Sequence, residues 1–109
     1  MEQAQEWQHI ADWMGVLSDL DGAAAVLEWD RETGMPEGGA AARGAQLSTL
    51  AALRHRHLLD PALGEPLAAI AQSSDPWQAA SARIALRDRA RASRVPEDLV
   101  RALAEASSH

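Results

Sequence analysis

The amino-acid sequence predicts an all-α fold, an antiparallel helical hairpin or bundle of about four to five helices with a long first helix. Hydrophobic residues make up 47% of the 109 positions, yet Phe and Tyr are absent and the aromatic residues are 4 Trp. A core of this kind depends on Leu and Ala, which lose little conformational freedom in a helix. Apolar residues also recur at helical spacing along the chain. At this length we expect residues 1–109 to form a single helical domain.

The first helix is expected over about residues 3–29 and is the longest. Its apolar positions advance by three or four residues, which is the spacing of one stripe on an α-helix: Trp7, Ile10, Met14, Leu17, Leu20, Ala24 and Leu27. Gly15 and Gly22 each cost about 1 kcal/mol relative to Ala inside a helix, so either one could mark a bend or a close backbone contact, but we expect one continuous helix. Thr33 and Gly34 then end the helix, since Gly favours the conformation found just past a helix end.

Further signals predict a second helix and a short segment after it. The second helix is expected over residues 39–57, with its buried face on or beside Leu47, Leu50, Leu53 and Leu58. Asp60 followed by Pro61 is typical of an N-cap with a first-turn proline. The sequence Gly64-Glu65-Pro66 repeats this signal, so we expect a short helical segment that ends near Gln72.

The clearest cap in the chain is Ser73-Ser74-Asp75-Pro76, which predicts a helix from Pro76 to about Ser93. We expect this helix to bury Trp77, Ala80 and Ile84. Val95-Pro96-Glu97 then opens a last helix, which carries Leu99, Val100, Leu103 and Ala106. The segments share no common pattern, so the sequence indicates no internal repeat.

Charge is distributed unevenly along the chain. Residues 1–37 are rich in acids and hold one basic residue, Arg31, whereas residues 83–94 hold Arg83, Arg87, Arg89, Arg91 and Arg94. The first and fourth helical segments are therefore expected to lie near each other with complementary faces. The alternative is that both faces are solvated without a partner, because exposed ion pairs contribute only about 0–1 kcal/mol each.

The composition argues against several classes of function. A formal net charge of -6 and a pI near 5.0 argue against a nucleic-acid-binding protein, so the arginines of residues 83–94 support nucleic-acid binding only as an alternative. The absence of Cys excludes disulfides and thiolate chemistry. The N-terminus lacks the pattern of a secretory signal, and no apolar run approaches the roughly 20 residues of a membrane span. We therefore expect a soluble cytoplasmic protein with no membrane partner.

Histidine and serine side chains are present but form no recognised catalytic set. His55 and His57 are two residues apart, which points them roughly 200° apart on a helix rather than toward one metal ion. We expect both at the surface or at the helix end, where cations suit the terminal carbonyls. Ser48, Ser81 and Ser93 lie within or at the end of helical patterns, without the glycine-flanked elbow of a nucleophilic serine.

Glu28 and Glu32 are the pair of carboxylates that most resembles a catalytic or metal-binding site. They lie four residues apart on one helix face with Asp30 beside them, and such a pair could serve acid–base chemistry or hold a divalent ion. On an acidic helix end, however, such residues are more often solvated, and Glu28 is well spaced for an ion pair with Arg31. Gly38-Gly39 before a helix is only a weak signal for an anion site. On its residues alone, the chain is a helical module without a catalytic set.

The order of the motifs nevertheless resembles a known family. The stretch from Leu27 to Leu50 reads L-x-W-D-x-x-T-x-M-P-x-G-G-x-x-x-R-x-x-Q-L-x-x-L. It resembles the N-terminal signature of the M32 (Taq-type) metallocarboxypeptidases through Trp29, Asp30, Thr33, Met35, Pro36, Gly38, Gly39, Arg43 and Gln46. The resemblance continues with His55, Asp60-Pro61-x-Leu63-Gly64, Arg87-Asp88-x-x-Arg91-Ala92, Val95-Pro96-x-x-Leu99-Val100 and Ala106-Ser107. It covers nearly the whole chain, but only the N-terminal part of such an enzyme.

This resemblance implies a large, mostly helical, cytosolic enzyme that removes C-terminal residues from peptides. Its zinc or cobalt ion is held by a His-Glu-x-x-His helix and a downstream Glu, all beyond the region that corresponds to His109. No catalytic or metal-binding residue is therefore carried over, and no cofactor is expected in this chain. Glu28, Glu32 and His55 remain the weak candidates for a site.

Two interpretations of the chain follow from the resemblance. We expect an excised or truncated N-terminal region, because the sequence stops within a helical pattern. Its helices would flank a substrate groove, with the remainder of a peptidase chain as partner and a peptide substrate bound only in the full enzyme. The alternative is a free-standing interaction module, such as a homodimer that buries Trp13, Val16 and Leu20.

The signature stretch itself is expected to have an architectural role. We predict that Trp29 anchors the end of the first helix in the core and that Asp30 and Thr33 hydrogen-bond the turn. Met35-Pro36 then directs the chain before Gly38-Gly39 starts the second helix.

Overall fold

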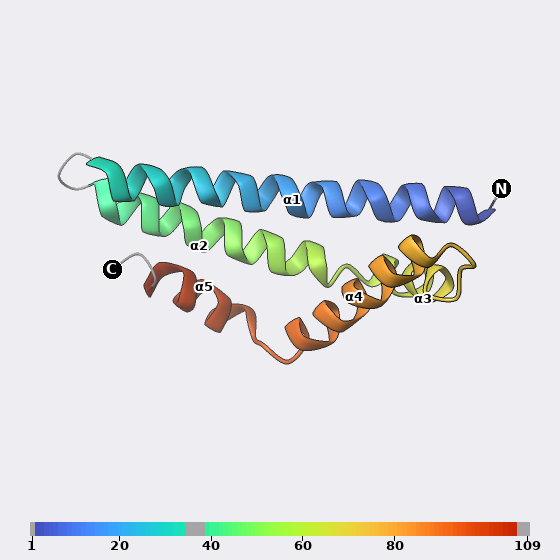
Figure 1. The fold of residues 1–109 in the computed structure, drawn as a ribbon. Helices are drawn as coiled ribbons and strands as arrows, with labels where there is room; N and C mark the ends of the chain where they lie inside the picture. The colour runs from blue at the N-terminus through green and yellow to red at the C-terminus, as the bar shows by residue number, and fades with distance from the viewer. Residues whose placement is uncertain (1, 35–38, 107–109) are drawn as a thin grey trace.

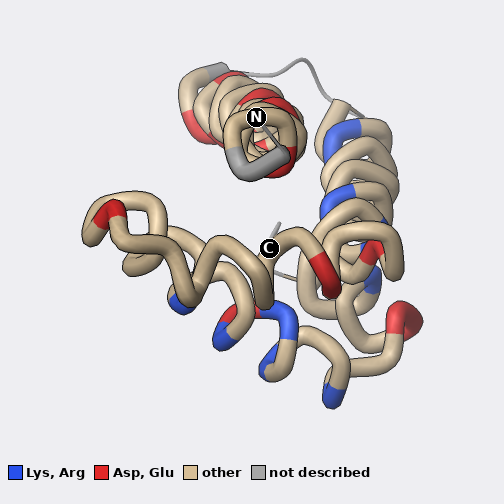
Figure 2. The backbone as a smooth tube through the Cα atoms, turned by 90° about the vertical axis from the view of Figure 1, so that its right-hand side faces the viewer, with Lys and Arg blue, Asp and Glu red and all other residues tan. Residues whose placement is uncertain are grey.

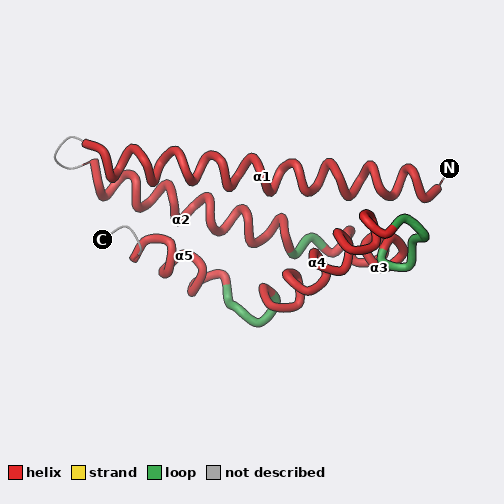
Figure 3. The backbone as a smooth tube through the Cα atoms, viewed as in Figure 1, coloured by secondary structure: helices red, strands yellow, loops and turns green. Residues whose placement is uncertain are grey.

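A computed structural model describes residues 2–34 and 39–106, with side chains described from residue 4 to 33 and from 39 to 106. These ranges contain helices and short connections but no strand, which confirms the all-α prediction (Figure 3). The elements are α1 (Glu2–Gly34), α2 (Gly39–Leu58), the 3-10 turn η1 (Pro61–Leu63), α3 (Gly64–Ile70), α4 (Pro76–Ala92) and α5 (Glu97–Ala106).

The helices form an elongated arrangement of 54 × 25 × 18 Å around an antiparallel hairpin of α1 and α2 (Figure 1). Helix α5 packs along α2, and α3 packs against both α4 and α1. The chain therefore has a thick end, where α3 and α4 join the N-terminal half of α1, and a thinner end, where α1 meets α2 (Figure 1).

The long first helix is confirmed and runs without interruption. Its predicted stripe from Trp7 to Leu27 is buried or half-buried at every predicted position. A Cβ atom added at Gly15 or Gly22 would meet no atom within 4 Å, so neither glycine marks a close backbone contact.

The two predicted aspartate caps are also confirmed. The Asp60 carboxylate accepts a hydrogen bond from the backbone N–H of Ala62, at the start of η1. The Asp75 carboxylate accepts from the N–H groups of Trp77 and Gln78, at the start of α4. Each cap satisfies backbone donors that a helix leaves without an internal partner.

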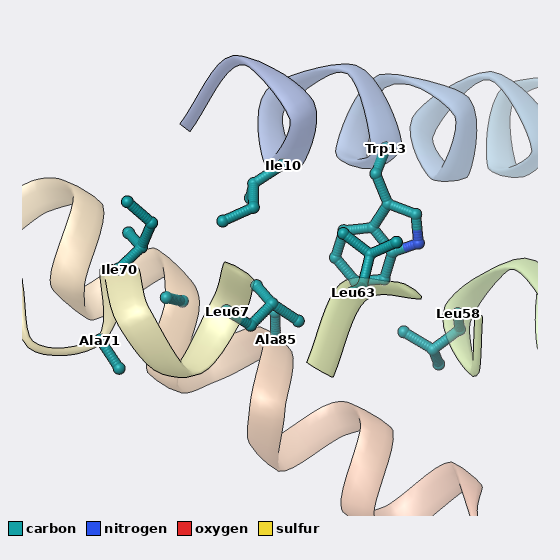
Figure 4. Packing of buried hydrophobic residues seen from close by; sticks show 9 residues of the cluster. Ile10, Trp13, Leu58, Leu63, Leu67, Ile70, Ala71 and Ala85 are labelled. Atoms are coloured by element: carbon teal, nitrogen blue, oxygen red, sulfur yellow. The ribbon is translucent and has the colours of Figure 1, made fainter. Parts of the chain in front are cut away.

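The hydrophobic core lies at the thick end of the molecule, where α1, α3, α4 and the end of α2 converge (Figure 4). Ile10, Leu63, Leu67 and Ile70 are its largest fully buried side chains. Around them pack Trp13, Leu58, Ala71, Ala82 and Ala85. Burying each large aliphatic side chain contributes about 1.5–3 kcal/mol, so this end supplies most of the hydrophobic stabilisation.

The prediction for the buried face of α4 was wrong. Trp77 and Ile84 are 75% and 55% exposed, and Ala80 is exposed as well. The helix instead buries Ala79, Ala82 and Ala85. Small alanine side chains let α3 approach closely, so the larger residues of α4 lie on its open side. On α2, Leu53 is likewise exposed, whereas Leu47, Ala52 and Leu58 are buried.

Trp13 and His57 join α1 to the end of α2 by a reciprocal pair of hydrogen bonds. The indole N–H of Trp13 donates to the carbonyl oxygen of His57 over 2.8 Å, and His57 Nε2 lies 3.0 Å from the carbonyl oxygen of Trp13. Because a carbonyl oxygen can only accept, Nε2 of His57 carries the proton. The two rings also stack, with centroids 6.0 Å apart. The burial of Trp13, which is 4% exposed, removes it from the homodimer surface predicted with Val16 and Leu20.

The acids of α1 pair with arginines of α2, not with those of α4. Arg54 Nε donates to Asp21 over 2.6 Å and Arg43 Nε donates to Asp30 over 2.7 Å. Across the described ranges no ion pair joins α1 to α4. The prediction that the acids of α1 face the arginines of α4 was therefore wrong. Figure 2 shows the acidic positions on α1 and the basic positions on α2 and α4. On α4, Arg89 instead donates to the carbonyl oxygens of Leu58 and Asp60 at the end of α2.

An ion pair holds α5 against α2. Arg56 Nη2 donates to the Glu97 carboxylate over 2.7 Å, and Arg101 lies 3.7 Å from the same carboxylate. The hydrogen bond from Arg56 lowers the pKa of Glu97 below its ordinary value. No residue of α5 is fully buried, and the helix packs along α2 through half-buried residues such as Val100 and Ala104 beside this pair.

We predict that Trp13→Phe destabilises the chain by about 1–3 kcal/mol, because the aromatic packing remains while a buried carbonyl loses its donor. Chemical unfolding followed by circular dichroism measures this difference. Trp77→Phe is the matched control and should change the free energy of unfolding by less than about 0.5 kcal/mol, because Trp77 is exposed. Equal effects of the two substitutions would contradict the role given to the Trp13 hydrogen bond.

The Glu97 pair predicts a pH-dependent difference between the wild type and Glu97→Gln. A carboxyl group with a lowered pKa in the folded state contributes stability above its unfolded pKa of about 4.3. That contribution is lost as pH falls through the folded pKa of Glu97. The wild type should therefore be more stable than Glu97→Gln at neutral pH, and unfolding curves at decreasing pH should converge. In an Arg56→Gln background the pH dependence should shrink, and a pH-independent difference would oppose this assignment.

Candidate functional site

The residues of the signature stretch gather at the thin end of the hairpin. Trp29, Asp30 and Thr33 lie on the last turns of α1, and Arg43 and Gln46 lie on the first turns of α2, which begins at Gly39 as predicted. Met35, Pro36 and Gly38 lie outside the described residues. The antiparallel path of the chain therefore brings the two halves of the stretch together (Figure 1).

Arg43 connects these two halves through its guanidinium group. Its Nε donates to the Asp30 carboxylate over 2.7 Å, and its Nη1 donates to the Gln46 side-chain oxygen over 3.0 Å. All three residues keep contact with solvent, so the pair contributes little stability by itself. A guanidinium group holds five N–H donors in a fixed plane, and the two that are engaged set the orientation of Arg43.

The prediction that Trp29 anchors the helix end in the core was wrong. Trp29 is 68% exposed, because its position faces away from the stripe that packs on α2. Thr33 Oγ1 donates to the carbonyl oxygen of Trp29 over 2.8 Å, one turn back in α1. Asp30 and Thr33 are thus both hydrogen-bonded at the end of α1, Asp30 to the neighbouring helix and Thr33 to its own.

An open groove of about 580 Å³ lies beside this cluster. Its walls are Leu27 of α1 together with Arg43, Ala45, Gln46, Thr49 and Leu50 of α2. The walls are mainly apolar, with the guanidinium group of Arg43 at their polar edge. Such a surface suits contact with apolar side chains and one oriented polar group, but it presents no nucleophile. The hydroxyl of Thr49 donates to the carbonyl oxygen of Ala45 within α2.

The candidate carboxylates do not form an acid–base pair. Glu28 accepts a 2.6 Å hydrogen bond from Arg31, which confirms the predicted i, i+3 ion pair. Glu32 is exposed on the same helix end. The Glu28 carboxylate is thus engaged by a guanidinium group, whereas Glu32 lies in solvent.

His55 lies far from these carboxylates, at the opposite end of α2. Its Nε2 is 3.0 Å from the carbonyl oxygen of Ala92 in α4, and the Nε2 of His57 is bonded to Trp13. Both histidines are at the helix end, as predicted, but they are half-buried and not at the surface. Within the described ranges no three His, Cys, Asp or Glu side chains come together as metal ligands. These residues therefore do not fit the zinc or cobalt ion that the resemblance implies.

Sequence reasoning missed three of the contacts that hold the hairpin and its end. They are the Trp13–His57 pair, the Asp21–Arg54 ion pair and the bonds from Arg89 to the end of α2. The acidic first helix and the histidine cluster were visible signals, but neither identified a partner. A backbone carbonyl acceptor cannot be identified from residue type, since every residue carries a carbonyl oxygen.

None of the helices in the described part is long and apolar enough to cross a membrane.

Comparison with known proteins identifies relatives of this chain. The family model described as carboxypeptidase Taq (M32) metallopeptidase matches residues 9–109. Thermostable carboxypeptidase 1 from Thermus thermophilus is 31% identical over 109 aligned positions, which cover 94% of this chain and 21% of the relative. The chain thus spans about a fifth of the length of this curated relative. No solved structure matches significantly. Because the family model covers nearly the whole sequence, the chain belongs to the carboxypeptidase Taq (M32) metallopeptidase family.

Proposed function

We propose that this chain is the N-terminal, groove-flanking region of a cytoplasmic metallocarboxypeptidase that removes C-terminal residues from peptides. The observation that carries the proposal is the family match over residues 9–109, together with the small fraction of the relative that the chain covers. On this proposal residues 1–109 form one helical domain, its partner is the remainder of the peptidase, and the zinc or cobalt ion and the peptide bind in the complete enzyme.

The arrangement of the thin end supports an architectural role for the signature stretch. Arg43 is bonded to Asp30 across the two helix ends and to Gln46 within α2. Among the residues that the structure describes, none of these side chains is bonded to a nucleophilic side chain or belongs to a metal-ligand set. The contribution of the stretch is then to shape one wall of a substrate groove, with the chemistry supplied by residues elsewhere in the enzyme.

A free-standing dimerisation module is the weaker alternative. Its predicted surface combined Trp13, Val16 and Leu20, and Trp13 is buried within the chain. Of that surface, Val16 is exposed and Leu20 is half-buried.

The gene that encodes the chain tests the proposed parentage directly. We expect the reading frame to continue after codon 109 and to encode a His-Glu-x-x-His motif, since that motif supplies two metal ligands and the general base of a metallopeptidase. Sequencing the genomic DNA beyond this codon provides the measurement. A stop codon at this point would instead favour the free-standing module.

We predict that the purified chain releases no C-terminal residue from a short peptide, with or without added zinc or cobalt. The reason is that Glu28 is paired with Arg31 and that His55 lies at the other end of α2. Mass spectrometry of the peptide before and after incubation measures the release. Release that a chelator abolishes would overturn the proposed inactivity, and a Glu28→Gln variant would then test this carboxylate.

Trp29→Ala should change the free energy of unfolding of the chain by less than about 0.5 kcal/mol, because the indole is mostly exposed. Leu67→Ala, at a fully buried position, should cost about 2–5 kcal/mol and serves as the reference. Thermal and chemical unfolding measure both. If Trp29→Ala proved as costly as Leu67→Ala, the exposed position of Trp29 would be refuted and the anchor role restored.

A further inference from the structure

Three cavities meet at Arg54, in the middle of α2. One of about 300 Å³ lies between α1, α2 and α4, one of about 170 Å³ between α1, α2 and α5, and one of about 400 Å³ between α2, α4 and α5. Arg54 lines all three. We refer to these three neighbouring cavities, which share Arg54, as the Arg54 groove.

The walls of the Arg54 groove are largely apolar. They include Met14, Leu17, Leu20, Leu50, Leu58 and Ile84. The charge of Arg54 is matched within the wall by Asp21, at 2.6 Å and 3.4 Å from its two bonded nitrogens. The groove is thus suited to an apolar occupant rather than to a charged small molecule.

The flanking helices present apolar side chains toward solvent. Ile84 of α4 is 55% exposed although it lines the groove, and Leu99 and Leu103 of α5 are exposed. Leu99 and Leu103 line none of the three cavities, so Ile84 is the exposed large apolar residue of the groove itself, and exposed apolar surface at a groove marks a site that a partner covers. Helices α4 and α5 diverge on either side of an apolar floor. An amphipathic helix can bind in a groove of this kind through its apolar face.

We propose that the Arg54 groove receives an amphipathic helix from the remaining part of the peptidase. This inference rests on the proposed function, and it names the surface by which the chain joins its partner. The occupant is assigned to the same enzyme because this chain covers 21% of the curated relative, so most of such an enzyme lies outside the region described. The apolar walls specify the occupant's apolar face, and the exposed charged residues Asp88 and Arg91, which also line the cavities, suit its polar edge.

The test measures binding of the 109-residue chain to the Thermus thermophilus relative from which the matched segment has been removed. As a positive control, the segment removed from the relative is added back as a separate chain, and its binding shows that the shortened relative is competent. Ile84→Arg places a charge in the groove at an exposed position, where folding tolerates it. Val26→Arg is the matched control, because Val26 is an aliphatic residue on α1 that is 67% exposed and lines none of the three cavities. Circular dichroism verifies that both variants are helical, and calorimetry measures the affinities.

We expect the wild type and Val26→Arg to bind alike, and Ile84→Arg to bind about tenfold or more weakly. Equal weakening by both variants, or by neither, would overturn the groove assignment while leaving the proposed function intact. Failure of the wild type to bind a competent relative would overturn the inference, and the reading frame beyond codon 109 would still decide the proposed function separately. Self-association of the chain in sedimentation that Ile84→Arg abolishes would show that a second copy is the occupant, and would also overturn the proposal.

Discussion

The reciprocal hydrogen bonds between Trp13 and His57 set the position of α2 along α1, and the other contacts of the hairpin depend on that position. The bonds join side chain to backbone in both directions, so a shift of either helix breaks both at once. With this end in register, the antiparallel paths bring Asp21 opposite Arg54 and then Asp30 opposite Arg43. Buried bonds at one end therefore align exposed ion pairs that would contribute little alone.

The two ends of the hairpin are stabilised by different interactions. At the thick end, α3 and α4 bury aliphatic side chains such as Leu67 and Ile70 against α1. Toward the thin end apolar burial continues at Leu47 but is accompanied by exposed ion pairs, and Trp29 lies largely in solvent. The fully buried aliphatic side chains thus lie away from the signature stretch. A substitution at the thin end can alter a contact surface with little effect on folding, whereas one in the core alters folding first.

The helices could be predicted from the sequence because the signals that specify them are local. The stripe of α1 and the caps at Asp60 and Asp75 depend on spacing and on neighbouring residues alone. The buried face of α4 was mispredicted because this helix has apolar residues on two sides, and periodicity does not say which side meets α3. The prediction assigned the larger side chains, such as Trp77, to the buried face, but the small alanines of α4 permit a closer approach of α3. The histidines were placed correctly along α2, yet their carbonyl partners depend on the tertiary fold and could not be read from the sequence.

The errors at Trp29, Trp77 and Ile84 share one physical cause. Each residue has the apolar character of a core position, and each is exposed in the chain as described. An apolar side chain indicates that burial is favourable, but it does not distinguish burial within the chain from burial against another polypeptide. For Ile84 the adjoining groove supplies the shape of such a contact. Among the three mispredicted residues, Ile84 is therefore the one whose exposed apolar surface the proposed peptidase remainder would cover at the Arg54 groove.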